Sequence, residues 1–143
     1  KEIYDTFMDE MPTGVEFFHG YTYSGHPLAA AAALATQQAI AEEDVYDRAR
    51  ELAPYFEEAV HSLKGEPNVT DIRNVGLAAG VTVASRDGAS GARGGEGFLK
   101  TYENGVAIRA NGDHLAIAPI LTMGRAEIDE TVEAFRKGLR AVA

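Results

Sequence analysis

The chain has 143 residues, of which 45% are hydrophobic and 24% are charged, as is typical of a folded globular protein. Its 22 acidic residues against 13 Lys and Arg give a formal net charge of -9, which argues against nucleic acid and anionic membranes as partners, because both need a basic face. The absence of cysteine excludes disulfides, thiolate metal sites and cysteine nucleophiles. The sequence has neither an apolar run of membrane-spanning length nor a signal peptide, so a cytoplasmic location is predicted.

Two helices are predicted in the first half of the chain. Alanine, the best helix former, dominates residues 28–42, and Pro27 suits a first helical turn, so this segment is predicted to be a buried helix. A second apolar stripe at helical spacing predicts a helix over residues 44–64. Asp44 can cap this helix, and Pro54 predicts a kink or a break within it.

The apolar period changes after residue 68. Residues 69–75 and 80–84 are predicted to be two strands joined by a glycine-containing turn. Five glycines in residues 87–97 predict a flexible surface loop, and a short helix is expected at 97–104.

Two further strands and a helix complete the chain. Residues 106–109 and 115–118 read as strands around an Asn-Gly turn, and a regular apolar stripe predicts a helix over 128–142. Because these strands are close in sequence, they are expected to pair locally. The second part is therefore predicted to be an α+β domain with an antiparallel sheet and helices on one face.

Several common site motifs are missing. The four histidines do not have zinc-ligand spacing, so no metal site is predicted. Ser24 lacks the glycine pattern of a hydrolase nucleophile. The glycine-rich segment 88–97 does not end in Gly-Lys-Ser/Thr, so it is neither a Walker-type nor a dinucleotide-binding loop.

Residues 19–27 form a first candidate binding segment. The hydroxyls of Thr22 and Ser24, with the backbone amides from Tyr23 to Gly25, could hold an anion at the start of the alanine-rich helix. In the alternative interpretation this is a capping loop in which Ser24 only satisfies the helix. The residue types alone do not decide between the two.

Arg109 is the second candidate. It ends an apolar strand and precedes a tight turn, where a guanidinium can bind a carboxylate through two parallel hydrogen bonds. The alternatives are a solvated arginine or a partner of Asp113. Arg73 is a similar but weaker candidate.

These segments carry a family resemblance. Residues 17–29 resemble a characteristic stretch of the class III aminotransferases, which use pyridoxal 5'-phosphate (PLP), and are closest to the omega-amino acid:pyruvate (β-alanine–pyruvate) branch. The resemblance continues through residues 43–56, 72–77, 106–109 and 112–119. It therefore extends over nearly the whole chain.

The resemblance implies a fold and an activity. The chain would be the C-terminal portion of an α/β, fold-type I PLP transferase. Residues 1–42 would form the tail of the large PLP-binding domain, and residues 43–143 the small C-terminal α+β domain. The complete enzyme would move an amino group from an amine or omega-amino acid to pyruvate.

The resemblance also implies roles for individual residues. Thr22 would donate a hydrogen bond to the cofactor phosphate across a dimer interface, with Tyr21 and Tyr23 completing the cofactor-binding set. Arg109 would bind the substrate α-carboxylate and swing away for an apolar substrate. The implied assembly is a homodimer or higher homo-oligomer with shared active sites.

In this family the lysine that holds PLP as a Schiff base lies upstream of the Thr22 motif. None of the chain's lysines has that sequence context; they are Lys1, Lys64, Lys100 and Lys137. No catalytic residue is therefore predicted in this chain, which is expected to be inactive alone. The alternatives are a non-catalytic α+β binding or regulatory domain, one half of a split enzyme, and another class III PLP enzyme such as an aminomutase.

Overall fold

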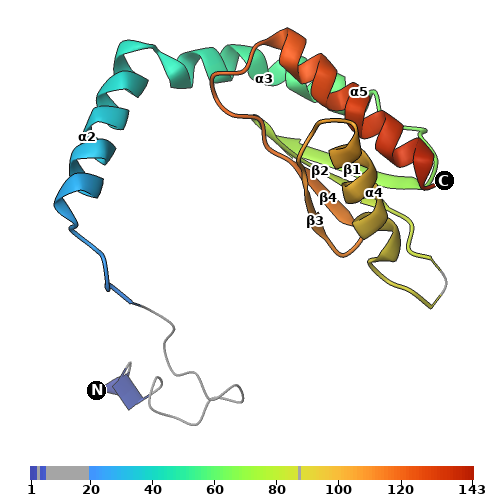
Figure 1. Ribbon diagram of the computed structural model, residues 1–143, viewed down its shortest axis with the longest axis horizontal. Coiled ribbons are helices and arrows are strands. Elements are labelled where there is room, and N and C mark those ends of the chain that lie inside the picture. Colours follow the sequence, from blue (N-terminus) through green and yellow to red (C-terminus); the bar gives the residue numbers. More distant parts are fainter. Residues whose placement is uncertain (3, 6–19, 87) are drawn as a thin grey trace. The chain divides into compact units, whose positions relative to one another are not determined.

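A computed structural model gives the fold and describes residues 1–2, 4–5, 20–86 and 88–143 (Figure 1). The beginning of the family-like stretch, residues 17–19, lies outside the described residues. The chain divides into two compact units, residues 1–39 and 40–143, each with its own internal contacts.

The alanine-rich segment forms helix α2 (Pro27–Glu42), with the predicted start and end. The prediction that this helix is buried is wrong for the described chain, because none of its residues is buried. Alanine needs no tertiary partner to favour helical backbone, since it loses no side-chain entropy there. The helix can therefore form in this chain without a covering layer.

Helix α3 (Val45–His61) opens the second unit. Asp44 stands at its N-cap position but has left-handed backbone (φ 50°) and makes no capping bond with its side chain. A capping side chain needs an extended N-cap backbone to reach the first amides, so the predicted cap is wrong. The helix continues through Pro54, so a break at this residue, one of the two predicted outcomes, does not occur. Its buried Phe56 and Val60 anchor it on the core.

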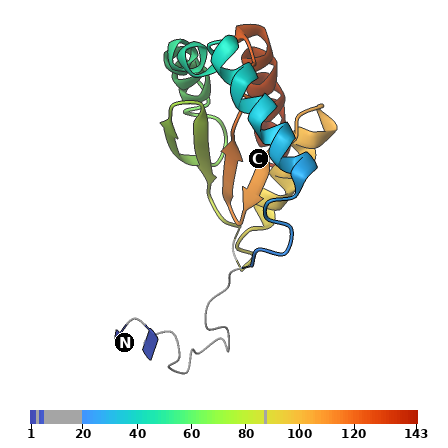
Figure 2. The same cartoon turned by 90° about the vertical axis from the view of Figure 1, so that its left-hand side faces the viewer.

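Among the described residues, four strands form an antiparallel sheet, as the sequence predicted for this domain. Their order is β1-β2-β4-β3, in which β2 pairs with β4 across the intervening helix. They are β1 (Val69–Val75), β2 (Ala78–Val83), β3 (Arg109–Asn111) and β4 (His114–Ile117). Figure 2 shows the strands side by side. The short β3 and the longer β1 are the two edges of the sheet.

Three helices cover one face of the sheet: α3, α4 (Ala92–Glu103) and α5 (Arg125–Ala141). In Figure 1, α3 and α5 run along the same side of the strands. Alternate strand residues point into the core that these elements share. The core consists of Phe56, Val60, Leu63, Ala79, Val81, Val83, Leu115, Ile117, Ile128, Val132, Phe135 and Leu139. The opposite sheet face carries the exposed strand residues.

Three of the predicted element starts in the second unit are wrong. Helix α4 begins at Ala92, within the segment predicted to be a flexible loop. Strand β3 begins at Arg109 rather than at 106, because the preceding residues still follow the helix end, where the amide of Val106 donates to the carbonyl of Thr101 (3.3 Å). The final helix begins three residues earlier than predicted, at Arg125.

The β1 edge is tied to α5 through Glu66, which precedes the strand. The Glu66 carboxylate accepts hydrogen bonds from Arg140 Nε (2.7 Å) and Arg140 Nη2 (2.8 Å), and another from Arg136 (2.5 Å). The Glu66 side chain is only 8% exposed. This cluster joins the α3–β1 connection to the last helix.

Candidate functional site

The first group of predicted site residues lies in a turn directly before α2. The amide of Ser24 donates to the carbonyl of Tyr21 (2.9 Å), and the amide of His26 donates to the carbonyl of Tyr23 (3.3 Å). Gly25 has φ 77°, a left-handed conformation that favours glycine. Thr22 lies inside this turn, five residues before the first residue of α2.

The turn has the features of an anion site. Tyr21, Thr22 and Tyr23 are all exposed, and the first turn of α2 contains no acidic residue that would repel an anion. The carbonyl of His26 accepts the first helical bond, from Ala30 (2.9 Å), so His26 rather than Ser24 stands at the cap position. A hydroxyl donor five residues before a 16-residue helix, whose N-terminus is the positive end of its dipole, is a candidate to bind a phosphate group.

The second group centres on Arg109, the first residue of β3. Its side chain is exposed at the sheet edge and lines a hollow of about 350 Å³ with Phe98, Ile108 and Ala110. Within residues 20–86 and 88–143, Arg109 forms no ion pair. A cation without a protein counter-charge beside an apolar surface suits a small carboxylate with an apolar remainder.

The alternative that Arg109 pairs with Asp113 is wrong. Asp113 is 7% exposed, and its carboxylate accepts hydrogen bonds from Ser85 Oγ (2.6 Å), Gly91 N (2.7 Å) and Gly94 N (3.0 Å). These donors, the Ser85 hydroxyl foremost, hold the pKa of Asp113 below its ordinary value. Sequence reasoning missed this role. The signal for it was the glycine-rich segment, in which Gly91 and Gly94 lie against Gly112 in the turn that contains Asp113.

Arg73 shares a sheet face and a row with Arg109. The register pairs Arg73 with Gly80, Gly80 with Ala116, and Ala116 with Arg109. Three strand spacings separate the two arginines, roughly 14 Å between their Cα atoms.

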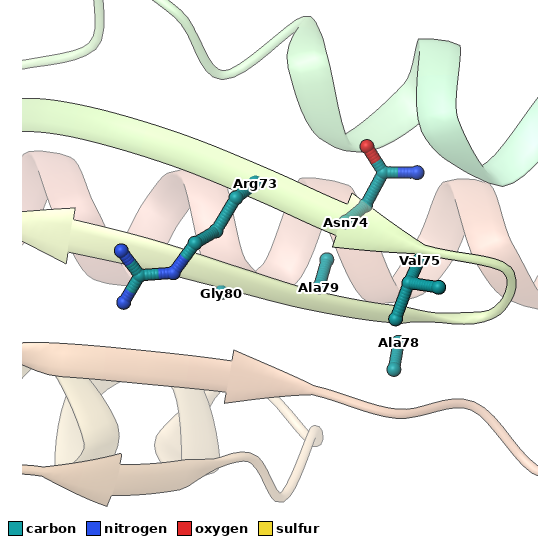
Figure 3. Close-up of a pocket in the computed structure, with 6 residues that line it drawn as sticks. All are labelled: Arg73, Asn74, Val75, Ala78, Ala79 and Gly80. Carbon is teal, nitrogen blue, oxygen red and sulfur yellow. The ribbon is translucent and has the colours of Figure 1, made fainter.

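Arg73 nevertheless has different surroundings. It pairs with Asp71 on its own strand (3.1 Å) and lines a separate hollow of about 310 Å³. Figure 3 shows the Arg73 side chain reaching across β2 at Gly80, whereas Asn74 points to the helical side. There Asn74 Oδ1 lies 2.9 Å from Nε2 of His61.

The two groups of predicted site residues belong to different units, with Tyr21, Thr22 and Tyr23 in the first and Arg109 in the second. The structure therefore describes each group by itself. In the described part of the chain, no three His, Asp or Glu side chains come together as metal ligands. Among the same residues, no helix is both long and apolar enough to cross a membrane.

Comparison with known proteins decides the family. The family model described as Aminotransferase class-III matches residues 1–139. The chain belongs to this family. Class III aminotransferases use PLP, and the resemblance predicted from the sequence is confirmed.

Several class III aminotransferases are similar to this chain. The omega-aminotransferase of Caulobacter vibrioides is 44% identical over 141 residues, which are 99% of this chain. The beta-alanine–pyruvate aminotransferase of Pseudomonas aeruginosa is 42% identical over 145 residues, covering 100% of the chain. In both cases the match spans 32% of the relative, so this class III chain corresponds to about a third of their length.

Solved structures of transaminases give the same result for the fold. The omega-transaminase of Pseudomonas jessenii, in complex with PMP, matches with a TM-score of 0.78 and 30% identity, covering 91% of this chain and 30% of its own. A transaminase with L-ala matches with a TM-score of 0.77 and 35% identity, covering 83% of this chain and 29% of its own. The fold-type I class predicted from the sequence is confirmed.

Proposed function

We propose that the chain is the C-terminal part of a PLP-dependent aminotransferase that moves an amino group from an amine or omega-amino acid to pyruvate. The observation that carries this proposal is the exposed Arg109, without an ion pair among the described residues, in a chain 42% identical to a beta-alanine–pyruvate aminotransferase. Residues 1–42 are assigned to the large PLP-binding domain and residues 43–143 to the small one. We also propose a cytoplasmic homodimer or higher homo-oligomer.

In this proposal the turn before α2 holds the cofactor phosphate. Thr22 donates its hydroxyl hydrogen to a phosphate oxygen in the neighbouring subunit's site, and Tyr21 and Tyr23 line the same phosphate. The helix N-terminus adds a favourable dipole. When bound, PLP supplies the electron sink that stabilises a carbanion at the substrate carbon.

Arg109 binds the substrate carboxylate through two parallel hydrogen bonds and so orients the acceptor carbon. Its place on an exposed edge leaves the side chain room to move away when the substrate has no carboxylate. The lysine that carries the cofactor and moves the proton belongs to another part of the enzyme. Lys100, for example, is engaged with Glu103 (2.8 Å). The chain is therefore expected to be inactive alone.

The test of this function is an assay of the complete polypeptide with PLP, β-alanine and pyruvate, beside the isolated chain. We expect alanine formation by the complete polypeptide and none by the isolated chain. A complete polypeptide that lacks the lysine would support a non-catalytic domain, and a co-purifying lysine-bearing chain would support a split enzyme. Migration of the amino group within one molecule would support an aminomutase.

The role of Thr22 has its own test. Thr22→Ala removes one hydrogen bond to a charged phosphate, worth about 1.5–3 kcal/mol, so the Kd for PLP is expected to rise about tenfold or more. Thr22→Ser keeps the hydroxyl and serves as the matched control. An unchanged Kd in the alanine variant, measured by equilibrium dialysis, would remove Thr22 from the phosphate site.

A further inference from the structure

Asp113 stands at the tip of the β3–β4 hairpin and joins it to the start of α4. The N-cap residue of α4 is Gly91, which has no side chain to satisfy the first amides of the helix. The Asp113 carboxylate accepts the amides of Gly91 (2.7 Å) and Gly94 (3.0 Å) instead. Asp113 is therefore the capping residue of a helix that begins 21 positions before it, at Ala92.

The contact between hairpin and helix is close at the backbone. A Cβ atom at Gly94 would lie 2.0 Å from the carbonyl oxygen of Gly112 and 2.9 Å from the Cα of Asp113. Gly91 has φ 83°, which favours glycine. These glycines let the hairpin tip lie directly on the first turn of α4.

This contact sets both walls of the hollow at Arg109. Strand β3 has three residues and, in the described part of the chain, pairs with β4 alone, so the hairpin determines where Arg109 lies. Phe98, on the other wall, follows Gly94 by four residues and so lies on the same side of α4. A shift of the hairpin tip on α4 would therefore change the distance between Arg109 and Phe98.

We propose that Asp113 is a positioning residue that holds Arg109 at the distance from α4 that binding of the substrate carboxylate requires. The proposal rests on the carboxylate-binding role given to Arg109 above. Ser85 helps to hold Asp113 in place, because the Ser85 hydroxyl donates to the Asp113 carboxylate (2.6 Å). Asp113 itself is buried and acts through the hairpin rather than on the substrate.

Asp113→Asn is the decisive substitution because it keeps the size of the side chain. An amide carries only one acceptor oxygen, so it cannot accept from both glycine amides and the serine hydroxyl as a carboxylate does. In the complete holoenzyme we expect KM for pyruvate to rise about tenfold, with kcat at saturating pyruvate and KM for a simple amine donor within about twofold. Ser85→Ala removes one donor and is expected to give a smaller rise, about threefold.

Two controls separate positioning from loss of stability. Asp129→Asn weakens a different contact between elements, because a neutral amide oxygen replaces the carboxylate that accepts the 2.6 Å bond from Tyr55 Oη, and it is expected to leave KM for pyruvate unchanged. An aldehyde acceptor that has no carboxylate should be converted equally by the wild type and Asp113→Asn. Equal losses with pyruvate and the aldehyde would contradict the proposal.

A double variant distinguishes failure of this inference from failure of the proposed function. With Arg109→Ala already present, Asp113→Asn should raise KM for pyruvate no further, since the two act through one contact. If Arg109→Ala alone leaves this KM unchanged, the proposed function of Arg109 fails. If Arg109→Ala raises it but Asp113→Asn does not, or the two effects add, only the positioning role fails.

A measurement without activity completes the test. In the chain itself, amide hydrogen exchange at Gly91 and Gly94 should be at least about tenfold faster in Asp113→Asn than in the wild type. Unchanged exchange would contradict the proposal. If Asp113→Asn does not fold, Ser85→Ala decides in the kinetic assay, because it removes the serine bond to Asp113 and retains both glycine bonds. An unchanged KM for pyruvate in Ser85→Ala would then overturn the positioning role proposed for Asp113.

Discussion

The two edges of the sheet are held in different ways. At one edge, β1 has seven residues, its Arg73 is paired with Asp71, and the preceding Glu66 is bound by two arginines of α5. At the other edge, β3 has three residues, and the β3–β4 hairpin is joined to α4 by the Asp113 carboxylate, which caps the start of that helix. Arg109 has no ion pair among the described residues there. The comparison teaches that an edge arginine can be paired with a carboxylate of its own protein. Alternatively, its strand can be fixed by a contact elsewhere in the hairpin, which leaves the guanidinium available to a ligand.

The largest effect is expected from disrupting the contact between Gly94 of α4 and the β3–β4 hairpin. Gly94→Ala would bring a methyl group to 2.0 Å from the Gly112 carbonyl oxygen, so backbone must move. We expect a loss of about 3 kcal/mol in the free energy of unfolding, measured by urea denaturation. A variant as stable as the wild type would contradict the close contact between hairpin and helix.

The next effect compares the two arginines directly. Arg109→Ala should raise KM for pyruvate about a hundredfold in the complete enzyme, because a bidentate charge-assisted contact is lost. Arg73→Ala, on the same face but in another hollow, is expected to change this KM less than about twofold. Steady-state kinetics with pyruvate and with a simple amine donor measure both. Equal rises for the two substrates in Arg109→Ala would argue against carboxylate binding.

A smaller effect is expected at the β1 edge. Glu66→Gln should lower the free energy of unfolding by about 1–3 kcal/mol at neutral pH, because it weakens hydrogen bonds to charged partners around a side chain that is 8% exposed. The bonds from Arg140 lower the pKa of Glu66 from its usual 4.5.

A lowered native-state pKa means that this contribution is complete above the unfolded-state value and is lost as the pH falls through the native one. The difference in stability between wild type and Glu66→Gln should therefore shrink in acid. Urea denaturation across this pH range measures it. A difference independent of pH would show that the charge of Glu66 is not what stabilises this edge.

The smallest effect is expected from Gly95→Ala, which serves as a control for Gly94→Ala. Gly95 is next to Gly94 in α4, but a Cβ atom there would meet nothing within 4 Å. Gly95→Ala is therefore expected to raise the free energy of unfolding by up to about 1 kcal/mol through helix propensity alone. Opposite signs for these neighbouring variants in thermal denaturation would assign the cost of Gly94→Ala to the hairpin. A similar loss in both would assign it to the helix.

Sequence patterns predicted the features that depend on neighbouring residues. Pro27 and the alanine run gave the bounds of α2, and the regular apolar stripe gave α5 to within three residues at its start. The start of α4 could not be found in this way, because its cap comes from Asp113 rather than from an adjacent side chain. The Asp44 cap failed because the prediction assumed an extended backbone that the chain does not adopt there.

The candidate site was predictable to a similar extent. The residue pattern around Thr22 left an anion site and a capping loop as alternatives. The resemblance assigned a cofactor phosphate to this segment, which remains a prediction. The exposure of Arg109 and its separation from Asp113 required the three-dimensional contacts. The shared row of Arg73 and Arg109 depends on the register of four strands, which distant parts of the chain set together.

The remote cap of α4 also has a consequence for the order of folding. The carboxylate and the amides that it accepts are 19 and 22 residues apart, so the first turn of α4 must wait for a chain loop of this size to close. The C-terminal part of α4 has no such requirement and can nucleate early. The beginning of this helix is therefore expected to form late, together with the short hairpin, in one cooperative step.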